Sequence, residues 1–435
     1  MGPVSRKMEQ SKSWDFLPIN IPLSLPPRPG TAESRMEGRY GLNVLERPEQ
    51  AFEKMKQVKF VELIQKIHLH VLNTTTFPPE RNRISHALLS IEHDLQQPLK
   101  ALYESKDSLT GTWHAFQARD HSFLYSQDKD SGAYQLVTIL AILAIGAEKQ
   151  VEEILEVDKS CAKRYARLVP PPKSSETAFY AKIHDECIVI NYLKKARVPN
   201  IASIRDIAHG DEHMFTMESC SQDLADFITK NYPKTDAEAY EYFSRVYQII
   251  LCLAETIEAM HKTNVCHRDI KPSNVLLRRE NGLPLLTDFG FAVFSKSQNV
   301  VTAGTIGYVA PELFLSFETT RPLPVSDLWS FGVLLYEAIK GENPFLKTQT
   351  LLHQAHCKFQ QYPTVETGDV VGQVTTQFSK LIARTQSALR IAKDPLEDLI
   401  AQLISEHPRS RGTAAEALAI IRNYVAKTDI MSSLD

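Results

Sequence analysis

The residue types best suited to chemistry gather in two short stretches past the middle of the chain. The first reads His-Arg-Asp-Ile-Lys-Pro-Ser-Asn at 267–274, and the second reads Asp-Phe-Gly at 288–290. Together they supply two carboxylates, a side-chain amide and a lysine. Carboxylate and amide oxygens are ligands that Mg²⁺ accepts, and a fixed lysine charge stabilises anionic phosphate oxygens. These are the groups that a phosphoryl transfer needs.

Three more motifs follow in order: Gly-Thr-Ile-Gly-Tyr-Val-Ala-Pro-Glu at 304–312, Ser-Asp-Leu-Trp-Ser-Phe-Gly at 326–332 and Arg-Gly-Thr-Ala at 411–414. A single Asp-Phe-Gly would carry little weight, but the whole series resembles the signatures of the protein kinase family in the family's own order. Lys271 followed by Pro-Ser-Asn is similar to the serine/threonine form of the catalytic loop. The resemblance covers residues 134–425, and it implies a buried ion pair between Glu312 and Arg411.

The resemblance assigns roles to the two reactive stretches. Asp269, expected on a surface loop, would accept or orient the proton of a serine or threonine hydroxyl, and Lys271 would hold positive charge beside the transferred phosphoryl group. Asn274 and Asp288 would hold Mg²⁺. Arg268 precedes the catalytic aspartate, and kinases with this arginine usually need an anion beside it to order the activation loop. That loop offers three hydroxyl residues for phosphorylation: Ser295, Ser297 and Thr302.

The expected ATP-binding part departs from the family pattern. Residues 143–151 align with the glycine-rich loop, but only its middle glycine, Gly146, is present, and Lys149 stands where the third glycine belongs. Missing glycines should stiffen the loop and weaken its grip on phosphate, because a Cβ keeps the backbone away from the ligand. The resemblance also implies an adenine pocket with Met217 as gatekeeper and these further contacts: Val151, Ala166, Glu218 and Leu276.

The lysine that usually contacts ATP is missing from its expected strand. In kinases this lysine ends a Val-Ala-Ile-Lys motif, and Tyr165-Ala166-Arg167-Leu168 is the best match to it. The match puts Leu168 at the lysine position, with Arg167 on the opposite face of the strand. Lys163 lies at the far start of this strand, and Lys182 belongs to the approach to the next helix. In kinases a glutamate on the following helix pairs with the lysine that contacts ATP. Counting back from Pro-Asn-Ile at 199–201 places Val189 at the position of that glutamate. Two carboxylates lie one helical turn earlier: Asp185 and Glu186.

Three readings follow from this departure. The first is an active kinase in which Lys149 replaces the strand lysine, as in the similar with-no-lysine kinases. The second is a pseudokinase scaffold that binds nucleotide weakly or not at all. The third is a partner-binding protein that acts through its N-terminal helical region and uses the kinase fold as a platform. The retained Asp269, Asn274 and Asp288 favour the first reading, because a scaffold needs no magnesium ligands.

Composition limits the alternatives. The chain has 435 residues, a formal net charge of −3 and 23% charged residues, so it lacks the overall basic charge typical of nucleic-acid binding. Its six cysteines form no C-x-x-C pair, which argues against a zinc site and favours a reducing compartment. The most apolar run, 137–147, is too short to span a bilayer and predicts a buried strand. We therefore expect a cytoplasmic protein with ATP and Mg²⁺ as cofactors and proteins as substrates.

The expected fold is α+β, a bilobal protein-kinase fold with an N-terminal helical extension. Residues 1–45 are rich in proline and predict a disordered tail, and 46–130 predict a pair of amphipathic helices that pack on the kinase or on a partner. Strand-like runs at 135–145, 151–157 and 163–169 begin the small β-rich lobe, expected over 131–218. The large helical lobe is expected over 219–425, followed by a tail at 426–435.

Overall fold

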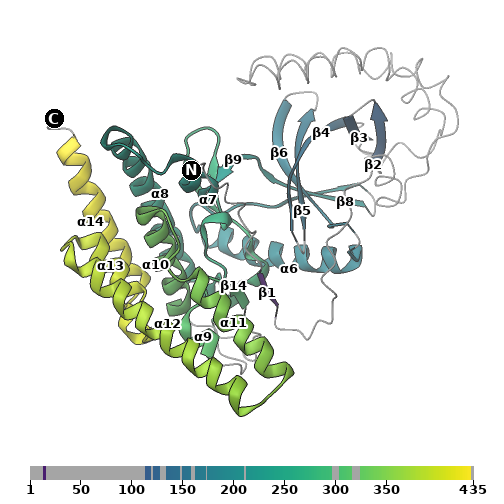
Figure 1. Cartoon of the computed structure of the whole chain (residues 1–435). Coiled ribbons are helices and arrows are strands. Elements are labelled where there is room, and N and C mark those ends of the chain that lie inside the picture. Colours follow the sequence, from purple (N-terminus) through teal and green to yellow (C-terminus); the bar gives the residue numbers. More distant parts are fainter. Residues whose placement is uncertain are drawn as a thin grey trace, which may run out of the picture. The chain divides into compact units, whose positions relative to one another are not determined.

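The computed structural model describes residues 134–432 apart from short gaps at 147–148, 158–161, 173, 210–211, 296–302 and 316–323, together with three strands nearer the N-terminus (Figure 1). Those strands are β1 (Ser13–Asp15), β2 (Trp113–Ala118) and β3 (His121–Gln127). The predicted proline-rich tail lies outside the described residues except for β1. The helical extension predicted over 46–130 also lies outside them, except for β2 and β3.

The chain divides into two compact units, which we call the sheet unit and the helical unit. The sheet unit takes in residues 21–181 and 203–219, and the helical unit takes in 1–20, 182–202 and 220–435. The helix α6 (Glu176–Lys195) begins in the first and continues in the second. A β-rich unit and a larger helical unit confirm the predicted α+β kinase architecture.

The sheet unit is built on seven antiparallel strands in the order β2-β3-β4-β5-β6-β8-β7. The remaining bounds are β4 (Tyr134–Ile145), β5 (Gln150–Val157), β6 (Ala162–Val169), β7 (Arg205–His209) and β8 (Glu212–Glu218). The three strand-like runs predicted from sequence are therefore confirmed as β4, β5 and β6. The boundary of the helical extension is wrong, because β2 and β3 lie inside 46–130. Their aromatic residues, Trp113, Phe116, Phe123 and Tyr125, are of a type enriched in strands, a shorter-range signal than the helical periodicity before them.

Register sorts the side chains of β5, β6 and β8 onto two faces, because residues directly opposite in an antiparallel pair share a face. Val151 pairs with Leu168, which pairs with Phe215, and the ring of Phe215 lies 6.4 Å from that of Phe179 on α6. This face is therefore the one that packs against the start of α6. The opposite face carries an apolar cluster of Val137, Ile154 and Met214.

The prediction of a buried strand over 137–147 is only partly correct. Val137 is fully buried, but Ile142, Leu143 and Ile145 are about half exposed, at 52%, 50% and 51%. The pairing explains the difference: β3 pairs with β4 only as far as Thr138, whereas β5 pairs with it to Ile145. Near the turn at Gly146, β4 is therefore hydrogen-bonded to β5 on one edge and is not paired with β3 on the other.

A buried ion pair lies on the face of the sheet opposite α6. Arg167 and Glu152 are 2% and 4% exposed, and Nη2 and Nε of Arg167 donate to Glu152 Oε2 at 2.6 and 3.1 Å. Gln150 donates to the other carboxylate oxygen at 2.7 Å. The carboxylate thus has its charge compensated inside the sheet unit, and Arg167 is engaged in structure on the face away from Leu168.

We expect Arg167→Met to destabilise the sheet unit by roughly 3–5 kcal/mol, because it leaves the Glu152 carboxylate buried without its cation. Urea unfolding monitored by circular dichroism would measure the loss. The double variant Glu152→Gln with Arg167→Met should recover most of it, and Arg390→Met, at an exposed arginine, serves as the control. A single variant as stable as the parent would mean that the ion pair contributes nothing.

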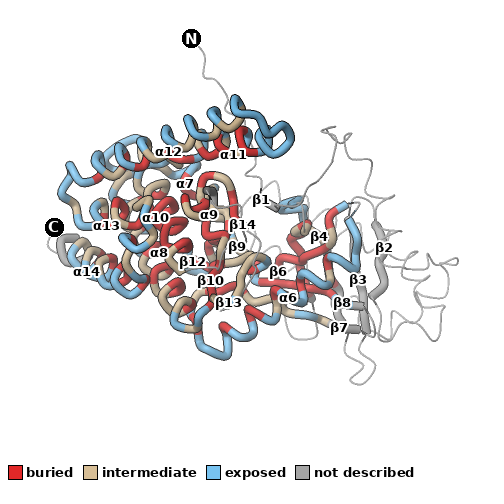
Figure 2. The backbone as a smooth tube through the Cα atoms, turned by 90° about the horizontal axis from the view of Figure 1, so that it is seen from below, coloured by how far each residue is buried: buried red, intermediate tan, exposed pale blue. Residues whose placement is uncertain are grey.

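The helical unit is organised around α10 (Pro324–Lys340), most of whose residues are buried (Figure 2). The Arg411 guanidinium donates to both carboxylate oxygens of Glu312 at 2.7 Å, which confirms the predicted ion pair. Arg411 is 1% exposed and also lies over the ring of Trp329, 5.2 Å from its centre. The predicted tail from 426 is wrong, since the last helix continues to Ser432. The helices of this unit are α7 (Leu224–Asn231), α8 (Asp236–Lys262), α9 (Pro311–Leu315), α10, α11 (Leu346–Gln361), α12 (Val365–Ile391), α13 (Pro395–Leu403) and α14 (Ala414–Ser432).

Short strands in the helical unit carry the loops that hold the reactive residues. They are β9 (Cys220–Asp223), β10 (Val265–Cys266), β11 (Val275–Arg278), β12 (Pro284–Leu286), β13 (Val293–Phe294) and β14 (Ala303–Thr305). None of the helices in the described part of the chain combines the length and apolarity needed to cross a membrane.

Candidate active site

A β-hairpin in the helical unit brings the two reactive stretches together. Strands β11 and β12 are antiparallel, with Val275 opposite Leu286, so Asn274 before β11 and Asp288 after β12 lie at the same end. The Thr287 N–H donates to the Asn274 carbonyl at 3.0 Å and closes this end. Asp288 adopts the left-handed conformation (φ 67°, ψ 64°), which is rare outside glycine and is typical of functional sites.

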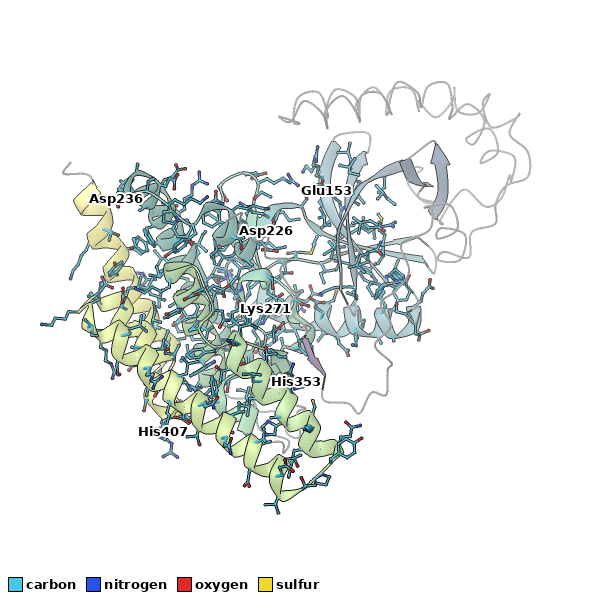
Figure 3. The ribbon with its side chains drawn as sticks, viewed as in Figure 1. Glu153, Asp226, Asp236, Lys271, His353 and His407 are labelled. Atoms are coloured by element: carbon cyan, nitrogen blue, oxygen red, sulfur yellow. The ribbon has the colours of Figure 1, made fainter. Side chains whose placement is uncertain are left out.

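Asp269 is the centre of a buried hydrogen-bond network. Its Oδ2 lies 2.8 Å from Lys271 Nζ and accepts from Asn274 Nδ2 at 2.9 Å, and its Oδ1 accepts from Thr305 Oγ1 at 2.6 Å. Lys271 Nζ in turn donates to Thr305 Oγ1 at 2.6 Å. The aspartate is only 2% exposed, so the predicted surface-loop position is wrong: three polar neighbours enclose the carboxylate. Figure 3 marks Lys271 within the helical unit.

A second carboxylate, Asp327 on α10, fixes the backbone that leads to Asp269. It accepts from the N–H groups of His267 and Arg268, both at 2.8 Å, and its Oδ2 lies 3.0 Å from His261 Nε2. Burial alone would raise the pKa of Asp327, but the hydrogen bond and charge of His261 and the nearby His267 hold that pKa below its ordinary value. The carboxylate is therefore ionised at neutral pH and holds Arg268 in a positive-φ conformation (φ 70°).

His267 and Glu186 hold the Asp-Phe-Gly stretch. His267 Nε2 lies 3.0 Å from the Thr287 carbonyl, and its ring packs 4.8 Å from that of Phe289. The Phe289 N–H donates to Glu186 Oε1 at 2.9 Å, and Glu186 is 4% exposed. Of the two carboxylates one turn before Val189, Glu186 is the one that contacts the Asp-Phe-Gly backbone, whereas the Asp185 side chain is 84% exposed.

Arg268, the third predicted catalytic residue, is held by the backbone of the activation loop. Its Nη1 donates to the Phe291 carbonyl at 3.3 Å, and burial lowers the pKa of its guanidinium. Among the three predicted phosphorylation sites in this loop, only Ser295 is described, and its N–H donates to the Asn264 carbonyl at 2.7 Å. Ser297 and Thr302 lie outside the described residues.

Three of the predicted nucleotide contacts of the sheet unit, Val151, Ala166 and Met217, share one face. Ala166 pairs with Met217, and alternation along β5 and β6 puts both on the face of Val151 and Leu168. Ala166, Leu168 and Met217 are buried, at 4%, 4% and 6% exposed, whereas the Glu218 side chain is exposed. In the helical unit, half-buried Leu276 pairs with Asp223 and Leu285 on β11. This register puts Leu168 on the face of Val151 and Ala166 and puts Arg167 on the opposite face.

The lysine candidates differ in their surroundings. Lys149 is half-buried in the turn between β4 and β5, where its carbonyl accepts from the Gly146 N–H at 2.9 Å. Lys182 is exposed on α6, four residues before Glu186, and Lys163 is exposed on β6. A Cβ at Gly146 would meet the Lys149 carbonyl at 3.1 Å, so a side chain there would press on this turn.

Magnesium suits the Asn274–Asp288 end of the hairpin on chemical grounds. Asn274 Nδ2 donates to both the carbonyl and the carboxylate of Asp269, which leaves the amide oxygen as the atom for a ligand. No cluster of three or more His, Cys, Asp or Glu able to hold a metal occurs among the described residues. A metal here would therefore need phosphate or water oxygens to complete its shell, as Mg²⁺ commonly does.

Sequence reasoning assigned no role to several residues that the structure places in these networks. Thr305 belongs to the motif at 304–312, but its hydrogen bond to Asp269 joins residues that are far apart in the sequence and required the fold. Asp327 belongs to the motif at 326–332, but the motif does not indicate that its carboxylate accepts hydrogen bonds from the backbone of His267 and Arg268. Glu153 belongs to no motif, and the sequence does not predict its role. It is buried on the face of Ala166 and accepts a hydrogen bond from Ser219 Oγ at 3.0 Å (Figure 3).

Comparison with known proteins identifies the family of the chain. A family model described as protein kinase domain matches residues 152–420. An SNF-related serine/threonine-protein kinase of Rattus norvegicus is 30% identical over 187 residues, 41% of this chain and 24% of that protein. The inhibitor of nuclear factor kappa-B kinase subunit beta of Mus musculus is 28% identical over 242 residues, 52% and 31% of the two chains. The serine/threonine-protein kinase ULK3 of Xenopus laevis is 34% identical over 197 residues, 43% and 40%. The chain thus spans well under half the length of these relatives.

Proposed function

Because the chain belongs to the protein kinase family, serine/threonine type, we propose that it transfers the γ-phosphoryl group of ATP to serine and threonine hydroxyls of proteins. The observation that carries the proposal is the contact set of Asp269 with Lys271, Asn274 and Thr305. A structural platform has no need for a buried carboxylate that is ringed by a cation, an amide and a hydroxyl.

The contacts of Asp269 suit a catalytic base. Three donors hold both carboxylate oxygens, which fixes the group in position, and such positioning supplies much of the catalysis of phosphoryl transfer. Lys271 lies beside Asp269 and would place its charge on the transferred phosphoryl oxygens. Thr305 bonds to both, so the base, the cation and the activation segment are held as one group. Asp269 takes the hydroxyl proton as the oxygen attacks phosphorus, and Lys271 keeps its own proton throughout.

ATP and Mg²⁺ belong to the same proposal. Asn274 and Asp288 would hold Mg²⁺, which would neutralise charge on the phosphates. The phosphates are assigned to the turn of Gly146 and Lys149. The adenine contacts remain those predicted from sequence: Val151, Ala166, Met217, Glu218 and Leu276.

We expect Asp288→Asn to weaken nucleotide binding in the presence of Mg²⁺ by about tenfold or more, because a neutral amide is a poorer magnesium ligand than a carboxylate. Binding of a fluorescent ATP analogue, titrated with and without Mg²⁺, would measure it. The exposed Asp369→Asn is the matched control. If the parent protein binds the analogue equally well without metal, the assignment of Asp288 as a metal ligand is wrong.

A pseudokinase is the second candidate, favoured by the buried Leu168 at the position of the usual lysine. The two functions differ in a thermal-shift measurement with ATP and Mg²⁺, because a ligand that binds only the folded state raises the melting temperature. The proposed kinase should gain several degrees at saturating nucleotide and transfer radiolabel to a generic basic protein. A chain that shows neither response is a scaffold.

A further inference from the structure

A short strand near the N-terminus pairs with the strand that carries Thr305. Strand β1 runs antiparallel to β14, with Ser13 opposite Thr305, Trp14 opposite Gly304 and Asp15 opposite Ala303. Both strands belong to the helical unit. Residues 13–15, which we call the β1 segment, therefore lie along the end of the activation segment, held by backbone pairing.

The register places one hydroxyl residue at the reactive end of this pairing. Thr305 is the residue of β14 whose side chain touches both Asp269 and Lys271. Directly opposite residues in an antiparallel pair have Cα atoms roughly 4.5–5.5 Å apart. Ser13 therefore lies directly opposite the residue that contacts Asp269. Trp14 and Asp15 lie opposite Gly304 and Ala303, which precede that residue on β14.

Pairing of this kind is a general way to bind extended peptides, because main-chain bonds hold the peptide while side chains remain available for recognition or reaction. We propose that the β1 segment is a peptide substrate held in cis and that Ser13 is phosphorylated by the chain's own active site. This inference rests on the proposed kinase function and adds a named acceptor to it.

The reaction balances with the groups already assigned. The Ser13 hydroxyl oxygen attacks the γ-phosphorus of ATP while Asp269 takes the hydroxyl proton. The bond between the γ-phosphorus and the bridging oxygen breaks, and ADP leaves with that electron pair. A phosphate on Ser13 would add negative charge beside the Asp269 carboxylate, so repulsion should then release the β1 segment and open β14 to other peptides.

The test uses the full chain, treated with a phosphatase and then given ATP and Mg²⁺, with phosphopeptides mapped by mass spectrometry. We expect phosphate on Ser13, formed at a rate per molecule that stays constant over about a tenfold dilution, because the acceptor is tethered. Ser13→Ala should abolish this phosphopeptide, and Ser5→Ala, in the same tail, should leave it. Transfer to a generic basic protein, measured in parallel, should persist in both variants.

A backbone variant separates pairing from mere proximity. Trp14→Pro removes a main-chain N–H and disfavours the strand, so it should slow Ser13 phosphorylation about tenfold without slowing transfer to the basic protein. Ser13 left unmodified, or modified at a rate that rises with protein concentration, while the basic protein is phosphorylated, would overturn the inference and leave the proposed function standing. Absence of transfer to every acceptor would overturn both.

Discussion

Asp269→Asn is expected to lower the rate of phosphoryl transfer about a thousandfold, a typical contribution of a positioned general base. The variant amide cannot take the hydroxyl proton, and it turns an N–H₂ toward one of the donors that now face a carboxylate oxygen: Lys271, Asn274 or Thr305. Radiolabel transfer from ATP to a generic basic protein would measure the loss under saturating nucleotide.

Folding must be measured alongside, because Asp269 is buried and not on an open surface loop. The backbone anchors at His267 and Arg268 remain, since they bond to Asp327 and not to Asp269. We therefore expect the circular dichroism spectrum to match that of the parent protein. The exposed Asp369→Asn should retain full activity. Unchanged transfer by Asp269→Asn would remove Asp269 from the mechanism.

The reactive loops were predictable because their chemistry is encoded in contiguous residues. Asp269, Lys271 and Asn274 lie within one loop, and the length of the β11–β12 hairpin fixes how that loop meets Asp288. Glu312 and Arg411 were also predictable as a pair, although they are far apart in sequence, because both stand in recognisable motifs. In each case, a motif carried information about packing that periodicity alone does not contain.

The less regular part of the chain shows where sequence reasoning stops. Counting back along α6 pointed to Val189, because a count assumes a fixed helix length, and only burial distinguishes Glu186 from Asp185. The early start of the sheet was missed because β2 and β3 follow a long stretch with helical periodicity. The buried pair of Arg167 and Glu152 left no sequence signal, since charged residues at a strand position usually predict a solvent-exposed face.

The buried pair changes the expectation for one lysine substitute. A strand position on the face opposite Leu168, taken alone, predicts only a modest loss of activity in Arg167→Met. With Glu152 as its partner, the same variant should destabilise the sheet unit, and any activity loss would follow from unfolding. Arg167 is therefore a structural cation, and Lys149 and Lys182 remain the candidates for the phosphate contact.

We expect Lys149→Met to lower the rate of phosphoryl transfer about a hundredfold, or about 3 kcal/mol in the transition state. Negative charge builds on the leaving phosphate group, and a catalyst needs a cation beside it. Leu168 cannot supply that charge. Lys149 lies in the β4–β5 turn, at the position aligned with the third glycine of the phosphate-binding loop, and we propose that its long side chain supplies the charge.

The matched variants are Lys182→Met on α6 and Lys163→Met on β6, which remove exposed lysines from the same part of the chain. Lys182→Met should lower activity modestly, and Lys163→Met should leave it unchanged. The converse variant, Lys149→Gly with Leu168→Lys, returns a lysine to the face shared by Val151 and Ala166 and should recover part of the lost rate. If Lys149→Met stays fully active while Lys182→Met loses activity, the cation comes from α6 and the role assigned to Lys149 is wrong.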